Sequence, residues 1–348
     1  MTKQECYNLL VKAKRPFECF GEVKTIEELH KIYKGLAKII HPDTAEDKDK
    51  YICTSGFAIL QDLYKRAQEE ISSGIYGIVN IIDIYDKSKE LFSFSSHGKT
   101  YRIYEKVFEG EVSDIYRGTC DKSLVSIKLG IEESDNDLIK REYETLNSFS
   151  HHSMPIVRDL IKINNNYAII MDNIEGENLL DIMDRNKNGI PAEVVMWVME
   201  RLFSVVGYLH SNYIVHGNIL PENIVINKSN HNVVLTGFSF HIPKANEDGS
   251  HYQIRNDEYS APEVNKTSRV GPESDIYSLG KLAIHMLGGN TSNNGLPINL
   301  DLGLRQFIRK LVTEDRYARP NDAWKLWDEW IALRNRIYGT QRFKQIDF

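Results

Sequence analysis

A short polar run between two apolar stretches has the residue types and the spacing of a catalytic loop. The sequence VHGNILPENIV at 215–225 places His216 first, then Asn218, and then Glu222 and Asn223 ahead of a second apolar run. A loop of this kind is expected to present a carboxylate that accepts a proton. Asn218 stands at that place, and an amide forms hydrogen bonds but cannot take up a proton at neutral pH. The loop therefore has the pattern of an active site without its proton acceptor.

The bulk composition limits the class of protein. The chain has 348 residues, is 41% hydrophobic and 26% charged, and carries a formal net charge of −6. This length can bury a sizeable core and is typical of about two domains, and the composition is that of an ordered globular chain. The negative balance gives no overall attraction to nucleic acid or to an anionic membrane, so we expect neither as a partner.

The cysteines and the apolar runs indicate the compartment. Cys6, Cys19, Cys53 and Cys120 are scattered and form no CxxC pair, so neither a disulfide framework nor a metal site is expected. The first residues contain no apolar core of signal-peptide length, and no apolar run is long enough to span a bilayer. We therefore expect a cytoplasmic protein.

Two helices are predicted in the N-terminal segment. Residues 25–40 begin with Thr25 and Glu28 at the spacing of a capping box. Apolar residues recur there at three- and four-residue steps, which predicts a buried stripe of Ile26, Leu29, Ile32, Tyr33, Leu36 and Ile40. A second helix over 54–72 carries on one face Phe57, Leu60, Tyr64 and Ala67. The turn HPDTAEDKDK lies between them and completes the pattern of an antiparallel helix pair.

This helix–turn–helix pattern carries a resemblance. Residues 5–77 are similar to the J domain of DnaJ-type co-chaperones, a small all-α domain, and we assign it to 1–77. The matching residues are Tyr33, Lys34, Leu36 and Ala37 before the turn, and Phe57 and Tyr64 after it. The resemblance implies that the domain docks on a DnaK-type heat-shock chaperone and stimulates its ATPase. The chaperone-binding residues it implies are Tyr33, Lys34, Lys38, His41, Pro42 and Asp43.

Simple physical chemistry is consistent with such docking. Pro42 fixes a backbone angle and stiffens the turn, and Asp43 offers a carboxylate to an arginine of a partner. Lys34 and Lys38 lie off the apolar stripe and would steer the helix toward an acidic surface. Gly35 departs from the family, which often has a basic residue there, and it weakens both the helix and the charge patch.

The pattern changes after residue 77. Glycine, serine and charge breaks without a helical stripe place a linker at 78–98. Short alternating segments then predict antiparallel strands, namely TYRIYEKVF, SDIYRGTC, LVSIKLG and YAIIMD. The predicted helices are 135–147, 191–212, 273–287, 302–312 and 321–336. This order predicts an α+β fold, with a β-rich small lobe at 99–172 and an α-rich large lobe at 173–340.

Seven motifs in order over 99–339 resemble the protein-kinase fold. They are VSIK with Lys128, IKREYETL with Glu142, VHGNILPENIVI with Asn218, VVLTGFSF with Gly237, YSAPEV with Glu263, SDIYSLG with Asp275 and EDRYARP with Arg319. The resemblance implies a bilobal fold held by a structural ion pair between Glu263 and Arg319. It also implies a nucleotide pocket formed by Gly110, Lys128, Glu142, Met171 and Asn223.

Three departures from the family concern the phosphate and metal chemistry. Gly237 stands where the family has the aspartate that binds magnesium, so that position offers no side-chain oxygen. Asn218 replaces the catalytic aspartate, and the loss of a positioned acid or base typically costs roughly 10²–10⁴-fold in rate. The glycine loop keeps Gly110 but has Phe108 and Ser113 at its outer glycine positions, which hinders close approach of the backbone to phosphates. We therefore interpret this domain as a pseudokinase.

These expectations combine into a co-chaperone-like adaptor. Its J domain would engage the chaperone, and its pseudokinase domain would bind a client or regulatory protein. Any ATP binding is expected to be weak and independent of magnesium.

Two alternatives remain. One is an atypical serine/threonine protein kinase or nucleotidyl transferase with a rearranged metal site, built from Asn223 and a carboxylate such as Asp257 or Glu258. The other is a scaffold whose J-like domain no longer binds a chaperone, with Gly35 as the sign of that loss.

Overall fold

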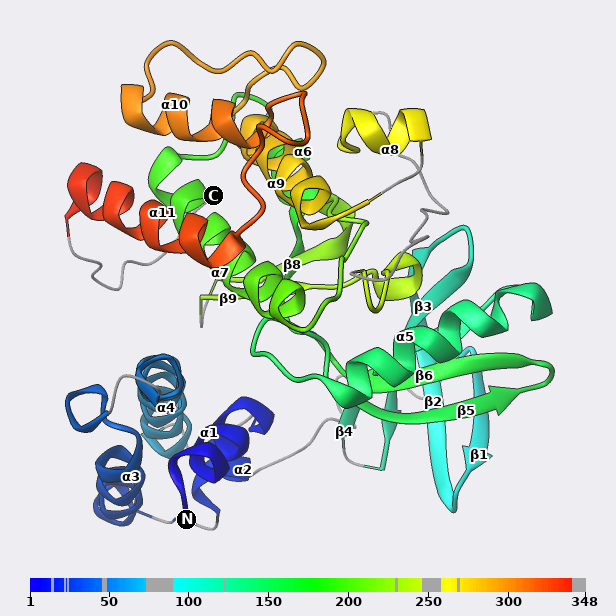
Figure 1. Ribbon diagram of the computed structural model, residues 1–348. Helices are drawn as coiled ribbons and strands as arrows, with labels where there is room; N and C mark the ends of the chain where they lie inside the picture. The colour runs from blue at the N-terminus through cyan, green and yellow to red at the C-terminus, as the bar shows by residue number, and fades with distance from the viewer. Residues whose placement is uncertain are drawn as a thin grey trace. The chain divides into compact units, whose positions relative to one another are not determined.

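The computed structural model divides the chain into two compact units (Figure 1). One unit is built mainly from residues 1–90, and the other mainly from residues 91 onward. The structure describes residues 1–13, 16–21, 23, 25–45, 49–72, 90–121, 123–228, 231–245, 258–267 and 270–339.

Helices form the N-terminal unit. They are α1 (Lys3–Lys12), α2 (Pro16–Phe20), α3 (Ile26–Ile40) and α4 (Lys50–Ser72). Helix α4 packs against the other three, and the side chains of Leu60, Leu63 and Ala67 on it lie in their shared core. Helix α4 begins one turn before the expected start at residue 54, because Cys53 is fully buried in the same core and extends the apolar face.

Helix α3 agrees with the sequence at its start and differs along its apolar stripe. The hydroxyl of Thr25 accepts a hydrogen bond from the backbone N–H of Glu28 at 3.2 Å, which caps the helix. Leu29, Leu36 and Ile40 are buried as expected. Ile26 and Ile32 were expected in the same stripe, but they are 42% and 36% exposed. The core therefore covers a narrower face of α3 than the sequence pattern predicts.

The second unit begins with a six-stranded sheet in the order β1-β2-β3-β4-β6-β5. The strands are β1 (Phe92–Ser96), β2 (Lys99–Glu109), β3 (Ser113–Cys120), β4 (Ser123–Gly130), β5 (Val157–Ile163) and β6 (Asn166–Asp172). The pairs β1–β2, β2–β3, β4–β6 and β5–β6 are antiparallel. Helix α5 (Asn136–Ser148) packs against β5 and β6, as Figure 1 shows. This is the β-rich small lobe.

Two strands of this lobe were not expected. Strand β1 lies inside the range 78–98 that the sequence assigned to a linker, because Phe94 stacks on Tyr101 of β2 with ring centroids 5.0 Å apart. Strand β5 follows a turn and pairs with β6, where only β6 was predicted. Residues 78–89 of the predicted linker lie outside the described residues.

The large lobe is mainly helical. Its helices are α6 (Leu179–Arg185), α7 (Ala192–Ser211), α8 (Pro262–Thr267), α9 (Pro272–Met286), α10 (Leu302–Leu311) and α11 (Ala323–Tyr338). Helix α7 is buried between α9 and α11, and the indole of Trp330 on α11 donates a hydrogen bond to the carbonyl of Met196 at 2.7 Å. A small sheet pairs β7 (Glu177–Asn178), β8 (Ile224–Asn227) and β9 (Asn232–Leu235). Within the described ranges, no helix combines the length and hydropathy that a membrane-spanning segment needs.

A buried ion pair joins two distant parts of the large lobe. Arg319 donates to Glu263 through two guanidinium nitrogens, at 2.7 and 3.1 Å. The same guanidinium donates to the carbonyls of Glu273, Thr313 and Glu314. Because Arg319 is only 4% exposed, each of these bonds replaces one that water would otherwise make. The pair fixes α8 against α9 and the turn before α11.

Loss of this arginine is expected to destabilise the large lobe strongly. Arg319→Gln leaves the Glu263 carboxylate buried without its counter-ion, so the free energy of unfolding should fall by about 3–5 kcal/mol. The matched control is Arg336→Gln, which breaks an exposed pair with Asp301 and should leave the free energy of unfolding nearly unchanged, because water screens the pair. Urea unfolding measures both changes. Equal losses in the two variants would contradict the structural role of Arg319.

Candidate functional site

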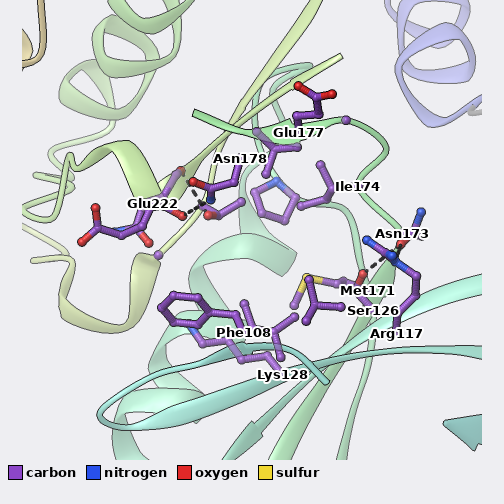
Figure 2. Close-up of a pocket in the computed structure, with 18 of the residues that line it drawn as sticks. Phe108, Arg117, Ser126, Lys128, Met171, Asn173, Ile174, Glu177, Asn178 and Glu222 are labelled. Carbon is purple, nitrogen blue, oxygen red and sulfur yellow. Dashed lines mark hydrogen bonds between the residues drawn. The ribbon is translucent and has the colours of Figure 1, made fainter. Parts of the chain in front are cut away.

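A pocket lies between the two lobes of the second unit (Figure 2). Its volume is about 490 Å³, within the usual range for small-molecule sites. Seven of the residues singled out from the sequence line it, namely Phe108, Ser113, Lys128, Glu142, Met171, Asn223 and Gly237. Gly110 and Asn218, which were also singled out, are not among the described residues that line it.

Lys128 and Glu142, which line the pocket, form a buried triad with Ser239. The ammonium of Lys128 on β4 lies 2.6 Å from Oε2 of Glu142 on α5. The hydroxyl of Ser239 accepts a hydrogen bond from Lys128 and donates one to Glu142, both at 2.8 Å. All three residues are buried, with at most 6% of their surface exposed. The carboxylate and the hydroxyl therefore neutralise and solvate the ammonium inside the protein.

Ser239 is the member of this triad that sequence reasoning missed. The motif LTGFSF showed only that Ser239 stands where the family has a glycine, two residues after the position of the metal-binding aspartate. Its hydrogen bonds depend on α5 and β4, which are about a hundred residues away along the chain, so no local pattern reveals them. The sequence offered one sign of this role, which is a side-chain hydroxyl at a position where the family has glycine.

The loop VHGNILPENIV is held in shape by Asp275. Its carboxylate accepts hydrogen bonds from the backbone N–H groups of His216 and Gly217, both at 2.8 Å. The ring of His216 donates from Nε2 to the carbonyl of Thr236 at 2.9 Å and accepts at Nδ1 from the N–H of Asn218 at 3.2 Å. Both ring nitrogens are thus occupied, and burial lowers the pKa of His216 to about 4, against the opposing Asp275 carboxylate. His216 is a structural residue of the loop.

Gly237 and Asn223 occupy the place where a metal ligand would be needed. Gly237 has a φ of +80°, which side-chain-bearing residues rarely adopt. A Cβ atom added there would lie 2.5 Å from Oδ1 and 2.6 Å from Nδ2 of Asn223. The side-chain amide of Asn223 donates to the carbonyl of Asn218 at 2.9 Å, and the backbone carbonyl of Asn223 accepts from the N–H of Thr236 at 2.7 Å. Asn223 therefore fills the space of the missing side chain.

These residues do not fit a magnesium site. Mg²⁺ requires an octahedron of oxygen ligands, usually anchored by one or two carboxylates. Gly237 supplies no oxygen, and among the described residues no three histidine, cysteine, aspartate or glutamate side chains cluster as metal ligands.

The sequence suggested a rearranged metal site in which Asn223 is joined by Asp257 or Glu258. The structure does not bring Glu258 to this site. Glu258 does not line the pocket, and its carboxylate accepts a hydrogen bond from the hydroxyl of Thr291 at 2.6 Å. Asp257 lies outside the described residues.

The glycine loop carries an aromatic side chain into the pocket. Phe108 is one of the lining residues, and its ring atom Cε1 would lie 3.0 Å from a Cβ atom placed on Gly110. The carbonyl of Ser113 would lie 2.7 Å from the same atom, so only glycine fits at this bend. Phe108 thus both lines the pocket and packs on the loop.

The pocket lining also contains polar contacts that were not expected, among them those of Asn173, Arg117 and Ser126 (Figure 2). The side-chain oxygen of Asn173 accepts from Arg117 at 3.3 Å and from the hydroxyl of Ser126 at 3.4 Å. Arg185 on α6 pairs with Glu177 at 2.5 Å. These residues come from β3, β4, α6 and the segment after β6, so their meeting depends on the tertiary fold.

The residues expected to bind a chaperone lie in the N-terminal unit. The turn at 41–43 is ordered by a hydrogen bond from the N–H of Asp43 to Nδ1 of His41 at 3.2 Å, and the His41 ring packs edge-on against Phe57. The Asp43 side chain is 86% exposed. Tyr33 stacks on Tyr64 of α4 with centroids 4.2 Å apart, which connects the two helices.

The lysines of α3 face the solvent. Lys34 and Lys38 are both exposed, so their charges are free to attract an acidic surface. Gly35 between them has open space around it, since a Cβ atom there would meet no other atom within 4 Å. Packing therefore does not require glycine at this position.

Comparison with known proteins shows the family to which the second unit belongs. A family model described as protein kinase domain matches residues 101–322. The chain is 22% identical over 275 residues to the serine/threonine-protein kinase pkn2 of Myxococcus xanthus, an alignment that covers 68% of this chain and 33% of that protein.

Two further relatives are also kinases. The chain is 26% identical over 249 residues to a probable serine/threonine-protein kinase of Dictyostelium discoideum, covering 70% of this chain and 49% of that protein. It is 22% identical over 254 residues to human myosin light chain kinase family member 4, covering 64% and 65%. The chain thus spans between about a third and about two thirds of the length of these relatives.

Restoring the aspartate at position 237 is not expected to restore a metal site. Gly237→Asp places a side chain in a backbone conformation that disfavours it and against the amide of Asn223, so the free energy of unfolding should fall by about 1–3 kcal/mol. Thermal unfolding with ATP and Mg²⁺ measures both stability and metal-dependent binding. Gly35→Ala, in open space on α3, is the control and should not destabilise the protein. A stable Gly237→Asp protein that binds ATP only with Mg²⁺ would show that the site accepts the missing ligand.

Proposed function

Because the chain belongs to the protein kinase domain family, we propose that its inter-lobe pocket binds an adenine-type ligand and that efficient phosphoryl transfer has been lost. The observation that carries this proposal is the pair Gly237 and Asn223. A glycine at a positive φ angle and the amide packed over it leave no carboxylate to hold magnesium at the centre of the site. Phosphoryl transfer relies on positioning and on charge neutralisation by metal, so this loss acts on its main requirement.

The catalytic loop supports the same proposal. Asp275 and His216 keep its backbone in order, yet Asn218 supplies an amide where the acceptor hydroxyl needs a carboxylate. The Lys128–Glu142 pair is assembled, so the pocket keeps its shape while its chemistry is weakened. We infer a pseudokinase domain that serves as a binding module for a client or regulatory protein.

An active kinase is the alternative that the relatives favour. The three relatives described above are kinases by name, and this fits an atypical serine/threonine kinase better than a co-chaperone adaptor. The assembled Lys128–Glu142 pair is also what an active site would need. An assay of phosphoryl transfer separates the two possibilities.

Nucleotide titration separates the pseudokinase from the kinase. We expect ATP to raise the midpoint of thermal unfolding only slightly, by less than about 2 °C, and equally with and without Mg²⁺, because a weakly bound ligand stabilises little. Transfer from γ-labelled ATP to the protein itself or to a mixed protein substrate should not exceed background. Labelled product that disappears in Lys128→Ala would establish the kinase and refute the pseudokinase.

The N-terminal unit suggests a second function, which the family match at 101–322 does not address. We propose that it is a J domain that docks on a DnaK-type chaperone. The supporting observation is the ordered turn at 41–43, which presents an 86% exposed Asp43 carboxylate beside the exposed lysines of α3. A rigid turn with an accessible carboxylate suits an arginine on a partner.

Chaperone stimulation tests the J-domain proposal. The purified protein should accelerate the ATPase of a DnaK-type chaperone, and Asp43→Asn should abolish that acceleration because the amide cannot form the charged pair. Asp62→Asn on α4 is the matched control and should keep full stimulation. Equal rates with the native protein and Asp43→Asn would refute the proposal. Direct measurement of chaperone binding then identifies a scaffold that has lost this partner.

A further inference from the structure

Helix α5 is hydrogen-bonded to residues 238–241, a stretch that we call the latch segment. The hydroxyl of Ser239 donates to the Glu142 carboxylate on the helix at 2.8 Å. The neighbouring Arg141 donates from its guanidinium to the backbone carbonyl of Ser239 at 3.2 Å. The middle of α5 is therefore attached to the latch segment by two side chains at once.

Thr145 and His241 form a second connection, three residues further along the helix. The Thr145 hydroxyl lies 2.7 Å from Nε2 of His241. The other ring nitrogen, Nδ1, faces the backbone carbonyl of Phe238, which can only accept, so Nδ1 carries the proton and donates it. Nε2 then accepts from the Thr145 hydroxyl. Burial lowers the pKa of His241, which favours the neutral ring that this arrangement needs.

The groups that make these connections are shielded from water. Glu142, Thr145, Ser239 and His241 are all buried. When such a bond breaks, a polar group is left unsatisfied in the interior, and this carries a free-energy cost. The bonds of the Ser239 hydroxyl are the stronger ones, because its partners Lys128 and Glu142 are charged. The latch segment is thus bonded to α5 by interactions that water does not replace.

The latch segment is also attached to the large lobe. The backbone of Ile242, the next residue, exchanges two hydrogen bonds with Val215, at 2.8 and 3.0 Å. The ring of Phe238 packs edge-on against His216, with centroids 4.6 Å apart. Helix α5 of the small lobe is therefore connected through the latch segment to the loop at 215–225.

We propose that the latch segment fixes α5 in the position that pairs Glu142 with Lys128, so that the helix and the segment open only together. The hydroxyls of Ser239 and Thr145 supply the connection, and no ligand is needed to form it. Displacement of the segment would release α5, and by reciprocity a shift of α5 would disturb the segment. This inference goes beyond the proposed function, because it concerns the position of α5 whether or not the pocket binds a nucleotide.

Hydrogen exchange of the full chain without ligand, followed by mass spectrometry, tests the latch. Ser239→Ala removes the hydroxyl and keeps the Cβ atom. It should accelerate the exchange of backbone amides in both α5 and the latch segment by about tenfold or more, because the loss of a hydrogen bond to a charged group shifts a local opening equilibrium by at least that factor. Amides of α7, in the core of the large lobe, should exchange at the native rate.

A second variant tests the connection at the other point of the helix. Thr145→Val replaces the hydroxyl by a methyl group of similar size and should accelerate exchange in the same two stretches by at least about threefold, since a bond between neutral groups contributes less. Thr145→Ser keeps a hydroxyl and should retain native exchange. The matched control is Ser278→Ala on α9, which removes a hydroxyl bonded to the carbonyls of Tyr259 and Ser274 and should leave the exchange of α5 unchanged.

The outcomes decide between a latch and general stabilisation. Faster exchange in both stretches, in Ser239→Ala and in Thr145→Val, supports the latch. Exchange in α7 that rises as much as exchange in α5 would show that the hydroxyls stabilise the whole unit, and this would overturn the inference. Unchanged exchange in α5, or a change confined to the residues beside each substitution, would overturn it as well. Should Ser239→Ala fail to fold, the pair Thr145→Val and Thr145→Ser decides alone. None of these measurements involves a nucleotide, so their failure leaves the proposed function standing.

Discussion

The buried ion pair between Lys128 and Glu142 is the constraint around which the second unit is arranged. An ammonium and a carboxylate can remain in the interior of a protein only when each solvates the other, and removal of either partner leaves a costly bare charge. Their contact requires α5 to lie against the sheet at one particular position. Ser239 extends the same requirement to the segment after Gly237, because its hydroxyl bonds to both charges. Three elements from different parts of the chain are thereby held together.

The backbone of the loop at 215–225 is held in shape by residues other than the one that would act on the acceptor hydroxyl. Asp275 bonds to two successive backbone N–H groups of the loop, and His216 uses both ring nitrogens within it. Asn218 takes part in these contacts only through its backbone N–H, and none of them uses its side chain. The shape of the loop and its capacity for chemistry therefore depend on different residues, so one can be retained while the other is lost.

The sequence was informative where function is encoded in short motifs. Lys128 and Glu142 were placed in one pocket, and Glu263 beside Arg319, because each lies in a motif with a fixed structural setting. The sequence was less informative where a contact joins distant segments. The bonds of Ser239, the network around Asn173, and strand β1 depend on tertiary packing, which local periodicity does not report. Ile26 and Ile32 show the same limit, since the helix pattern marked them as buried and the core does not reach them.

The triad of Lys128, Glu142 and Ser239 also has a thermodynamic consequence for any small molecule that enters the pocket. A binding site whose residues become ordered only when the ligand binds loses conformational entropy, and this loss weakens the affinity. In this protein, hydrogen bonds already join the sheet, helix α5 and the segment bearing Ser239 in the absence of a ligand. The pocket is therefore preorganised, and a ligand would bind with little rearrangement of the backbone. Its selectivity would come from the fixed shape of the pocket.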